Sequence, residues 1–588
     1  MAVTSNAVGN WVLPGGQGTQ SRQRRIASTR LVYLPMALLA TVVTLATTGF
    51  EFGVSNNVYH LPYVLGYAAL PQFAHDQFYQ DLRYIVSYVW PIERRFATEA
   101  NVRDLFLGSY VVALLAYYAA LLWLVARFAG FRPIGLVLAA LLLGLTYLDS
   151  GYSMLAGENL VGGYFTETQV ATALVTASLV LALDRRLLMA IVLLGLAFDA
   201  QFELALWALA ALLGITIELM RNGVPVSRSW AIGGAVALLL AAPTIVWLAH
   251  SIMAVGRFDG DYLDYLGQVG PNQWLLWTVP LQKWVLFVSN LLLGFAALAI
   301  LGPVAKPARG AFIGFIGVFV VGCALPFITG NQWVLNLRLM ASDGFLQILA
   351  STAAAAVVVR DIGQLRGIDK VGLSVVVAAS LLLSRYLLPI AALAMLARAA
   401  LASGELLGLE RRIPEFDTGM LGRYAIALLV LLLVAGGCLR YTRPLYWIEA
   451  EPQRDPGFAA LVDWARQHTG TGSTFLVNGE TGGPFDKFQM WSKREVWLDD
   501  RRGASGMWDP RYYAFWKRRI DRLATMHSPG ERLAFSCGAG VDYYADQTSP
   551  EFNLGAPDVS RFVAYQARGY FVIDVKSYCA SRNGDATR

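Results

Sequence analysis

The chain has 588 residues, of which 56% are hydrophobic and only 15% are charged. Soluble domains carry about 25% charged residues, so most of this chain cannot be solvated by water and its expected solvent is a lipid bilayer. The net charge of +6 does not indicate nucleic-acid binding, because the basic residues form short clusters between apolar segments and no reader motif is present. The four cysteines include no CxxC spacing, which argues against a zinc or redox site.

The N-terminal segment is polar. Residues 1–30 end in a basic cluster, and we expect them to form a disordered cytoplasmic tail. The apolar segment 31–50 is long enough to span a membrane and lacks a clean signal-peptidase site before Glu51. It therefore predicts a signal-anchor helix.

Further apolar segments follow, and each is a candidate membrane helix. They are 105–126, 133–148, 169–183, 187–198, 203–220, 230–250, 284–302, 311–328, 345–359, 371–384, 386–400 and 424–440. Together with the first segment they predict about thirteen spans, at roughly 20 residues each with some tilted or broken. Clusters of Lys and Arg fall on alternate connections, so the positive-inside rule places the N-terminus in the cytoplasm and the C-terminus outside.

The segment 187–198 is short for a span and runs directly into Asp199, Gln201 and Glu203. This pattern suits a helix that dips under a polar cavity, and it equally suits a tilted helix with a polar end at the interface. The large connections, including a first loop at 51–104, all fall on the outer side. This asymmetry indicates that the protein functions at its outer face.

From about residue 441 the composition becomes that of a water-soluble domain. The pattern predicts an amphipathic helix in DPGFAALVDWARQHTG and strands in STFLVNG, KREVWLDD and GYFVIDV. Residues 441–588 are enough for one α/β domain. Cys537 and Cys579 both lie there; in an oxidising exterior they could form a disulfide, and the alternative is two free buried thiols.

Acidic side chains follow the first apolar segment. Glu51 lies at the membrane boundary, where a desolvated carboxylate suits a general base that deprotonates an acceptor hydroxyl; the alternative is an acid that simply faces water. Asp76 and Asp81 are five residues apart and would not share a helix face well. One of them could instead cap a helix that begins near Gln77.

Two further side chains in this loop are candidate ligand contacts. His60 precedes Leu61 and Pro62, which predicts a turn, and it could bind a phosphate or a sugar hydroxyl or satisfy local backbone. Asn57 lies three residues earlier and is a second candidate for substrate binding.

The whole pattern resembles the GT-C superfamily of integral membrane glycosyltransferases, which use polyprenyl-phosphate-linked sugars. The features that carry the resemblance are a cytoplasmic N-terminus, a first helix ending in an acid, a long first outer loop, about thirteen spans and an outer C-terminal domain. The tail, with FLVNG and SKREVWLDD, is similar to uncharacterised bacterial proteins of this type. One departure is Phe50-Glu51-Phe52, where protein mannosyltransferases carry an Asp-Glu pair, and this leaves metal dependence open.

The resemblance implies that an outward-facing cation holds the lipid phosphate. Arg338 and Arg385 both fall at outer helix ends and could make bidentate phosphate contacts. A structural pairing with Glu158, Glu167 or Asp343 is the alternative. The glycine-rich stretch from Glu158 to Glu167 could also bend close to a substrate.

The sequence therefore predicts a polytopic α-helical GT-C-like enzyme of a bacterial inner membrane, which moves a sugar from a polyprenyl-phosphate carrier to a glycan, lipid or protein acceptor. Glu51 would act as base, Asp76 or Asp81 would orient the acceptor or hold a divalent metal ion, and Arg338 and Arg385 would stabilise the departing phosphate. The expected partners are the lipid-linked donor and membrane lipids.

Two other classes of protein remain open. A transporter or flippase would require ionisable residues in mid-membrane and an inverted repeat. A catalytically inactive GT-C-like scaffold would bind lipids or partner proteins through its tail. The sequence specifies neither the sugar, the acceptor nor the oligomeric state.

Overall fold

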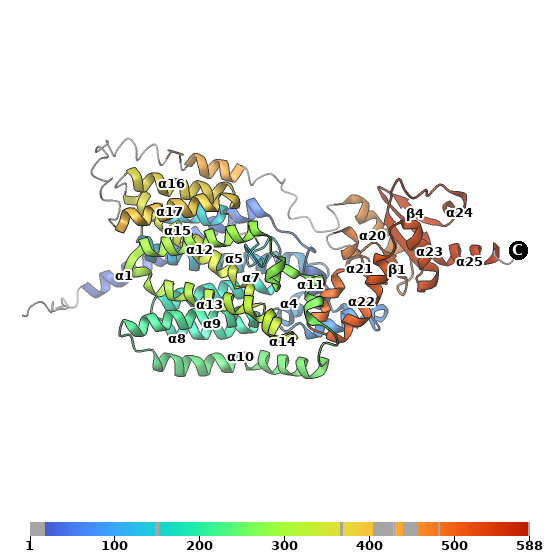
Figure 1. The fold of residues 1–588 in the computed structure, drawn as a ribbon, viewed down its shortest axis with the longest axis horizontal. Coiled ribbons are helices and arrows are strands. Elements are labelled where there is room, and N and C mark those ends of the chain that lie inside the picture. The colour runs from blue at the N-terminus through green and yellow to red at the C-terminus, as the bar shows by residue number, and fades with distance from the viewer. Residues whose placement is uncertain are drawn as a thin grey trace, which may run out of the picture.

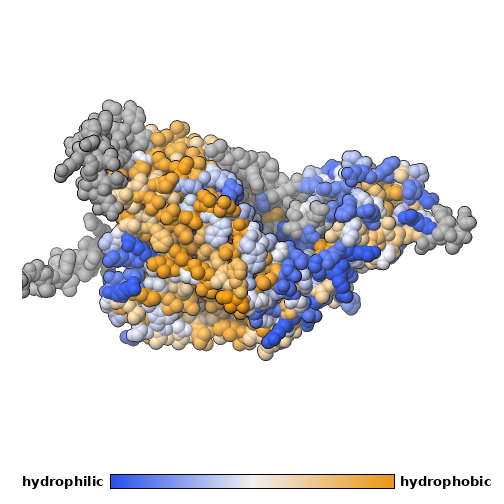
Figure 2. Space-filling model, viewed as in Figure 1, coloured by the Kyte–Doolittle hydropathy of each residue, from blue (hydrophilic) through white to orange (hydrophobic). Residues whose placement is uncertain are grey.

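The computed structural model describes residues 18–146, 152–364, 368–403, 427–428, 430–438, 455–479 and 483–585. Figure 1 shows two parts, a bundle of long helices and a smaller α/β unit that contains the C-terminal residues. In the view of Figure 2, hydrophobic side chains cover most of the helix bundle, whereas hydrophilic side chains gather over the C-terminal unit. The division follows the change in composition near residue 441.

The predicted apolar segments form helices wherever they are described. The helices of the bundle are α1 (Gly18–Thr48), α5 (Val102–Ala129), α6 (Pro133–Leu145), α7 (Glu167–Leu183), α8 (Leu187–Ala200), α9 (Phe202–Arg221), α10 (Ser227–Val255), α12 (Leu281–Leu301), α13 (Lys306–Ile328), α15 (Asp343–Gln364), α16 (Ile368–Leu383) and α17 (Leu388–Ser403). Residues 430–438 are also helical, and the rest of the predicted segment 424–440 lies largely outside the described residues. Helix α1 begins at Gly18, so residues 18–30 are helical where a disordered tail was predicted.

Five described stretches are long and apolar enough to cross a membrane. They are Val102–Ala129, Phe202–Arg221, Ser227–Val255, Leu281–Ile328 and Gln332–Ile362. Helices α6, α7 and α8 are apolar but shorter, as tilted or broken spans would be. The total of about thirteen spans stays a prediction.

Small residues allow close packing between helices of the bundle. Gly214 of α9 faces Gly310 of α13, and a Cβ on either glycine would overlap the backbone of the other. A Cβ on Gly195 of α8 would likewise overlap the backbone of Ala237 in α10. Small residues permit such approaches between membrane helices. The contacts join these four helices into one layer, and the first turn of α9 carries Glu203.

The 51–104 loop contains the short helices α2 (Asn57–Val64), α3 (Gln77–Asp81) and α4 (Val89–Phe96). Asp76 caps α3, because its side chain accepts a hydrogen bond of 3.0 Å from the Tyr79 N–H. The capping alternative for the acidic pair is therefore confirmed. The turn predicted at His60 is wrong, because His60 lies inside α2. Pro62 lies in the same helix, which is only two turns long and loses little backbone hydrogen bonding to it.

The C-terminal unit is a mixed sheet covered by helices on both faces. Its elements are α20 (Pro456–His468), β1 (Thr474–Val477), α21 (Phe488–Ser492), β2 (Glu495–Val496), η11 (Arg501–Met507), α22 (Pro510–Ala524), α23 (Pro529–Ala539), β3 (Tyr543–Gln547), β4 (Val563–Ala567), β5 (Tyr570–Asp574) and α25 (Val575–Asp585). The strand order is β2-β1-β3-β5-β4. Strand β1 is parallel to β2 and β3, and β5 is antiparallel to β3 and β4.

Alternating side chains of β1 fill two cores. Phe475 and Val477 pack with apolar residues of α20, whereas Leu476 packs on the other face with residues of α23 and α25. A disulfide between Cys537 and Cys579 ties α23 to α25, with their Cα atoms 5.6 Å apart. The structure thus favours the disulfide over two free thiols.

Candidate functional site

Arg338 lies at the centre of a mostly buried group of charges. It occupies the connection between α14 (Gln332–Leu335) and the 3-10 turn η7 (Leu339–Ser342), with a left-handed φ of 45°. Its Nη1 donates to Glu158 Oε2 at 2.8 Å, and its Nη2 and Nε donate to Glu203 Oε2 at 2.7 and 3.1 Å. Only 17% of the Arg338 side chain is exposed, so the guanidinium depends on these two carboxylates as its counter-ions.

A folded connection before α7 positions Glu158. The Ser153 N–H donates to the Glu158 carbonyl oxygen, and the Glu158 N–H donates to Ser153 Oγ at 3.0 Å. The carboxylate of Asp343, at the start of α15, accepts a hydrogen bond of 2.7 Å from the Leu155 N–H. Helix α15 therefore holds the connection that carries Glu158, and Asp343 binds backbone where a pairing with Arg338 was one of the expected alternatives.

Glu167 is placed at the first position of α7 by the capping box of Thr166 and Gln169. Its Oε2 lies 3.4 Å from His60 Nε2, and the His60 ring stacks on Trp90 with a centroid distance of 3.9 Å. Burial lowers the pKa of His60 to about 3, so the ring is neutral at physiological pH.

Within the described part of the chain, His60 Nδ1 is buried and has no hydrogen-bond partner, and the buried Glu167 Oε2 has only the 3.4 Å contact with His60 Nε2 as a polar contact. Buried polar atoms nearly always have a hydrogen-bond partner, so these two atoms indicate a site where a ligand or water would bind. Glu167 also lies near Arg338, Glu158 and Glu203. We call Arg338, Glu158, Glu167 and Glu203 the Arg338 cluster.

Glu51 lies directly after α1 and is fixed to the same connection by backbone. Its N–H donates to the Gly163 carbonyl oxygen at 2.6 Å. Asn57 adds a second link, because its Oδ1 accepts from the Gly53 N–H and its Nδ2 donates to the Phe165 carbonyl oxygen, each at 3.1 Å. Asn57 thus holds the start of the 51–104 loop against residues 158–166, so Glu51 lies beside the segment that joins Glu158 to Glu167.

Asp76 is directed to the C-terminal unit instead. Its Oδ2 accepts from Gln489 Nε2 at 2.6 Å and lies 3.5 Å from Arg502 Nη1. Arg502 is also paired with Asp499 at 3.0 Å. We call Asp76, Gln489, Asp499 and Arg502 the junction cluster, since they join the loop to the C-terminal unit.

Asp81 meets the same unit at a second point. It lies against Asp509, whose carboxylate binds Arg511 through both of its oxygens. Burial, followed by the charge of Asp509, raises the pKa of Asp81 to about 8. Both candidate acids of α3 therefore contact the C-terminal unit and not the Arg338 cluster.

The 3-10 helix η11 covers this end of the bundle. Side-chain groups from α2, from α11 (Tyr262–Val269) and from the connection that carries Arg338 donate hydrogen bonds to its backbone carbonyls. These bonds run from Tyr59 to Arg501, from Tyr265 to Gly503 and from Asn336 to Met507, at 2.8–2.9 Å. One segment thus covers two short helices and the connection that carries Arg338.

Arg385 is exposed in the turn η8 (Arg385–Leu387). Its guanidinium lies 5.2 Å from the Tyr386 ring centroid, and Nη2 is 3.3 Å from the Tyr386 hydroxyl. Its contacts with the described residues do not bring it into the Arg338 cluster.

Sequence reasoning missed Glu203 as a partner of Arg338. It noted Glu203 only as part of the polar end of the segment 187–198, and the available signal was an acid in the first turn of an apolar helix. In the parts of the chain that the structure describes, no three His, Cys, Asp or Glu side chains group so as to hold a metal ion. The Arg338 guanidinium lies between Glu158 and Glu203. The divalent metal ion considered at Asp76 or Asp81 stays a prediction.

No family model and no curated protein sequence matches the chain. Among solved structures it is similar to ArnT from Cupriavidus metallidurans bound to undecaprenyl phosphate, with a TM-score of 0.38 and 14% identity over 93% of this chain and 97% of that one. It is also similar to the arabinosyltransferase EmbB from Mycobacterium smegmatis, with a TM-score of 0.31 and 14% identity over 74% of this chain and 42% of that one. Likeness at this level assigns no role to any residue.

Proposed function

We propose that the chain is a glycosyltransferase of a bacterial inner membrane, which moves a sugar from a polyprenyl-phosphate carrier to a glycan, lipid or protein acceptor at the outer face. The Arg338 cluster supports this proposal most directly. It gathers carboxylates around one guanidinium and leaves Glu167 Oε2 without a hydrogen-bond partner among the described residues. Carboxylates and guanidinium groups hold sugar hydroxyls well, because both make directional, charge-assisted hydrogen bonds.

The sidedness of the proposal has two supports. The 51–104 loop and the C-terminal unit contact each other through Asp76 and Arg502, which supports their being on the same side of the membrane. The disulfide between Cys537 and Cys579 suits an oxidising compartment, such as the bacterial periplasm. Together with the basic inner connections, these observations support a reaction at the outer face and a cytoplasmic N-terminus.

In the proposed reaction, Glu51 accepts the proton of the acceptor hydroxyl as the acceptor oxygen attacks the anomeric carbon. The bond from that carbon to the phosphate oxygen breaks, and the polyprenyl phosphate leaves with the electron pair. Positive charge develops on the sugar ring in such a transition state. The carboxylates of the Arg338 cluster stabilise this charge from fixed positions.

Arg338 and Arg385 have different roles in this proposal. Arg338 is surrounded by more carboxylates than it can neutralise, so it chiefly orients Glu158 and Glu203, and its remaining N–H groups are available to the substrate. Arg385 is the exposed cation available to the phosphate of a carrier held in the membrane. Asp76 and Asp81 act as positioning residues that keep η11 over the cluster.

The test is sugar transfer by Glu51→Gln in proteoliposomes, with a panel of radiolabelled polyprenyl-phosphate hexoses and pentoses as donors. We expect kcat to fall by roughly 10²–10⁴, the usual contribution of a general base, with an unchanged melting temperature. Glu551→Gln is the matched control, since Glu551 is exposed in the C-terminal unit. Transfer at the wild-type rate by Glu51→Gln would reject this base. Movement of the lipid between leaflets without any transfer would favour the flippase class.

A further inference from the structure

An apolar groove of about 690 Å³ lies among four helices of the bundle, α1, α5, α7 and α8. Ala116, Ala119 and Ala120 line it from one face of α5, because residues three and four apart in a helix are neighbours. Ala177 of α7 also lines it. Alanine side chains are too short to fill the space between these helices. We call this space the alanine groove.

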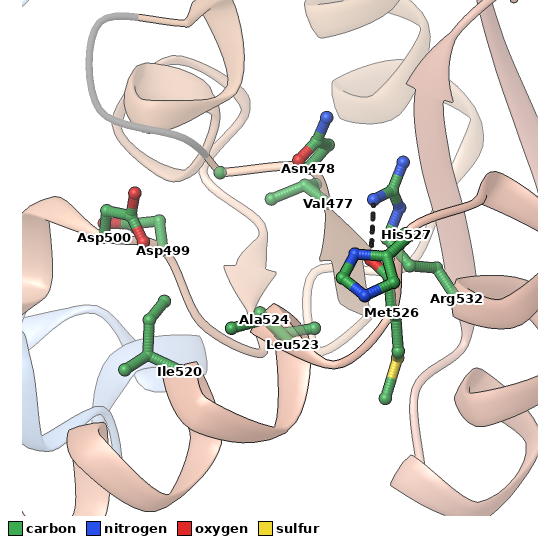
Figure 3. Close-up of a pocket in the computed structure, with 11 residues that line it drawn as sticks. Val477, Asn478, Asp499, Asp500, Ile520, Leu523, Ala524, Met526, His527 and Arg532 are labelled. Atoms are coloured by element: carbon green, nitrogen blue, oxygen red, sulfur yellow. Dashed lines mark hydrogen bonds between the residues drawn. The ribbon is translucent and has the colours of Figure 1, made fainter.

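The C-terminal unit contains a smaller cavity, of about 370 Å³ (Figure 3). Arg532 donates there to the Met526 carbonyl oxygen at 3.4 Å and pairs with Asp546 at 3.1 Å. Asp499 is paired with Arg502 at 3.0 Å. These charges are bound within the protein, and the alanine groove differs in this respect.

The alanine groove is open toward the surroundings of the bundle. Leu34 of α1 and Met189 of α8 line it, and they are 63% and 52% exposed. Exposed apolar surface of this kind marks contact with a membrane or a partner. A lipid can therefore enter the groove from the side.

The groove lies at the end of the bundle opposite the Arg338 cluster. Helix α7 begins at Glu167 of that cluster, and its groove residues Ala177 and Val180 lie in its last two turns. A helix of 17 residues is about 25 Å long, close to the hydrocarbon thickness of roughly 30 Å. Figure 1 likewise shows α1, which contributes Tyr33, starting at the end farthest from the C-terminal unit. The groove therefore belongs to the leaflet opposite that unit, which the basic connections predict to be the inner one.

Aromatic rings and a cation line the end of the groove nearest the membrane surface. Along α5 the alanines are followed by Trp123, whose ring stacks with that of Tyr33 at a centroid distance of 6.3 Å. The Arg186 guanidinium lies 5.8 Å from the Trp123 ring centroid. Trp and Tyr concentrate at the level of the lipid headgroups. The groove thus changes from apolar to aromatic to cationic, in the order of the parts of a phospholipid.

The charge at this end of the groove is positive. Asp184 lies in the connection between α7 and α8, and Arg127 binds its carboxylate. Arg185 and Arg186 follow it; both are exposed, and neither takes part in an ion pair with another described residue. Four more arginines precede the groove residues of α1, between positions 22 and 30. Two cations therefore remain available to an anion in the headgroup region.

A phospholipid with a net negative charge matches both parts of the groove. Its acyl chain can lie along the alanines of α5, and its phosphate can accept charge-assisted hydrogen bonds from Arg185 and Arg186. A lipid without phosphate would leave both cations unpaired, and a zwitterionic lipid would bring an ammonium group close to them. The phosphate of the polyprenyl carrier, in the proposed reaction, lies at the other end of the bundle.

We propose that the alanine groove binds an anionic phospholipid from the leaflet opposite the C-terminal unit. The acyl chain fills the space between α1 and α7, and the phosphate binds Arg185 and Arg186. Helix α1 leads to Glu51, and α7 begins with Glu167. The lipid thus supports, from their far ends, the two helices that position these acids. This site is separate from the proposed transfer reaction and does not rest on it.

The test is native mass spectrometry of the full-length protein in detergent. The protein is titrated with phosphatidylglycerol, with phosphatidylethanolamine of the same acyl chains, and with a polyprenyl phosphate. The double variant Arg185→Gln with Arg186→Gln removes the two cations. Its matched control is Arg221→Gln with Arg228→Gln, which removes two exposed cations beside the α9–α10 connection at the same end of the bundle.

A second pair of variants tests the apolar part by bulk and leaves the charges unchanged. Ala116→Phe fills the groove from α5, at a position that is exposed and therefore tolerates a larger side chain. The matched control is Val112→Phe, one turn earlier on the same helix. Val112 is 67% exposed and does not line the groove.

We expect the wild type and both controls to bind phosphatidylglycerol more tightly than phosphatidylethanolamine. An arginine near an anionic lipid contributes about fivefold in affinity, so the preference should be at least about tenfold and should disappear in the Arg185 and Arg186 double variant. Ala116→Phe should weaken binding of the tightest phosphatidylglycerol several-fold.

Equal affinity of the wild type for the two phospholipids would overturn the proposal, as would an equal loss in the Arg221 and Arg228 double variant. Tighter binding of polyprenyl phosphate that Ala116→Phe abolishes would overturn it in favour of the carrier. A dimer that Ala116→Phe dissociates would overturn it in favour of a second copy of the chain. None of these measurements depends on sugar transfer, so the lipid site and the glycosyltransferase can fail separately.

Discussion

Two groups of buried charge lie where the helix bundle meets the C-terminal unit, and they differ in how fully their polar atoms are paired. In the junction cluster, Asp76 uses both of its oxygens, one on the Tyr79 N–H and one on Gln489. In the Arg338 cluster, carboxylates share one guanidinium, and Glu167 Oε2 has no hydrogen-bond partner in the described part of the chain.

The difference separates two uses of buried charge. A fully paired network fixes one arrangement of the chain, since every partner lost would leave a buried charge exposed to a low dielectric. A network with spare acceptors retains capacity for hydrogen bonds with a ligand. We therefore expect changes in the junction cluster to act mainly on stability and changes at Glu167 to act mainly on the reaction.

The largest effect should come from Arg338→Met. It leaves Glu158 and Glu203 buried without their counter-ion, and removing one partner of a buried pair costs about 3–5 kcal/mol. Thermal unfolding followed by tryptophan fluorescence measures the loss. Adding Glu158→Gln and Glu203→Gln should restore much of the stability without restoring transfer. A cost below about 1 kcal/mol for Arg338→Met would instead place these charges in solvent.

A direct comparison of Asp76→Asn with Glu167→Gln should give the next largest effect. Asp76→Asn weakens charge-assisted hydrogen bonds to Gln489 and Arg502, and should lower stability by about 1.5–3 kcal/mol. Glu167→Gln should change the melting temperature little and lower kcat/KM more than Asp76→Asn does. Unfolding and transfer assays on the two variants supply both numbers. The reverse order of effects would contradict the division between the clusters.

The smallest effect, when taken per unit of pH, is a dependence of stability on pH that arises at Asp81. Because the pKa of Asp81 is raised to about 8, the folded protein keeps a proton there that the unfolded chain releases near pH 4. The folded state binds more protons across this window, so stability falls as the pH rises through it and levels off above about pH 8.

We expect the wild type to lose about 1 kcal/mol per pH unit between pH 6 and 8. Asp81→Asn should lose less, because its amide does not titrate. Melting temperatures measured at half-unit steps test this expectation. Parallel curves for the two proteins would show that Asp81 is charged at the junction.

Much of the helix bundle could be predicted because a long apolar segment indicates a membrane helix without information from the rest of the chain. The segment 105–126 became α5, and 203–220 became α9. The capping of α3 by Asp76 could also be predicted, because it depends only on neighbouring residues. Strands β3 and β4 were missed because Tyr543–Gln547 and Val563–Ala567 mix polar with apolar residues, and β3 owes its burial to neighbours in the sheet.

The site was harder to predict because its contacts are distant in sequence. Glu203 and Glu158 lie 135 and 180 residues from Arg338. The pairing of Arg338 with Glu158 was one of the alternatives considered, whereas nothing local indicated Glu203. The meeting of Asp81 with Asp509 likewise depends on how the C-terminal unit docks, and no pattern around Asp81 contains that information.

The covering of the bundle by η11 also determines the order in which these contacts form during biosynthesis. Tyr59 and Asp76 bind partners made 442 and 413 residues later, so the 51–104 loop emerges long before the segment that covers it. Until translation is nearly complete, the Asp76 carboxylate and the aromatic side chains around it stay uncovered. A prematurely terminated chain would keep this surface bare, so a protease or chaperone that binds exposed aromatic surface would distinguish it from the complete protein.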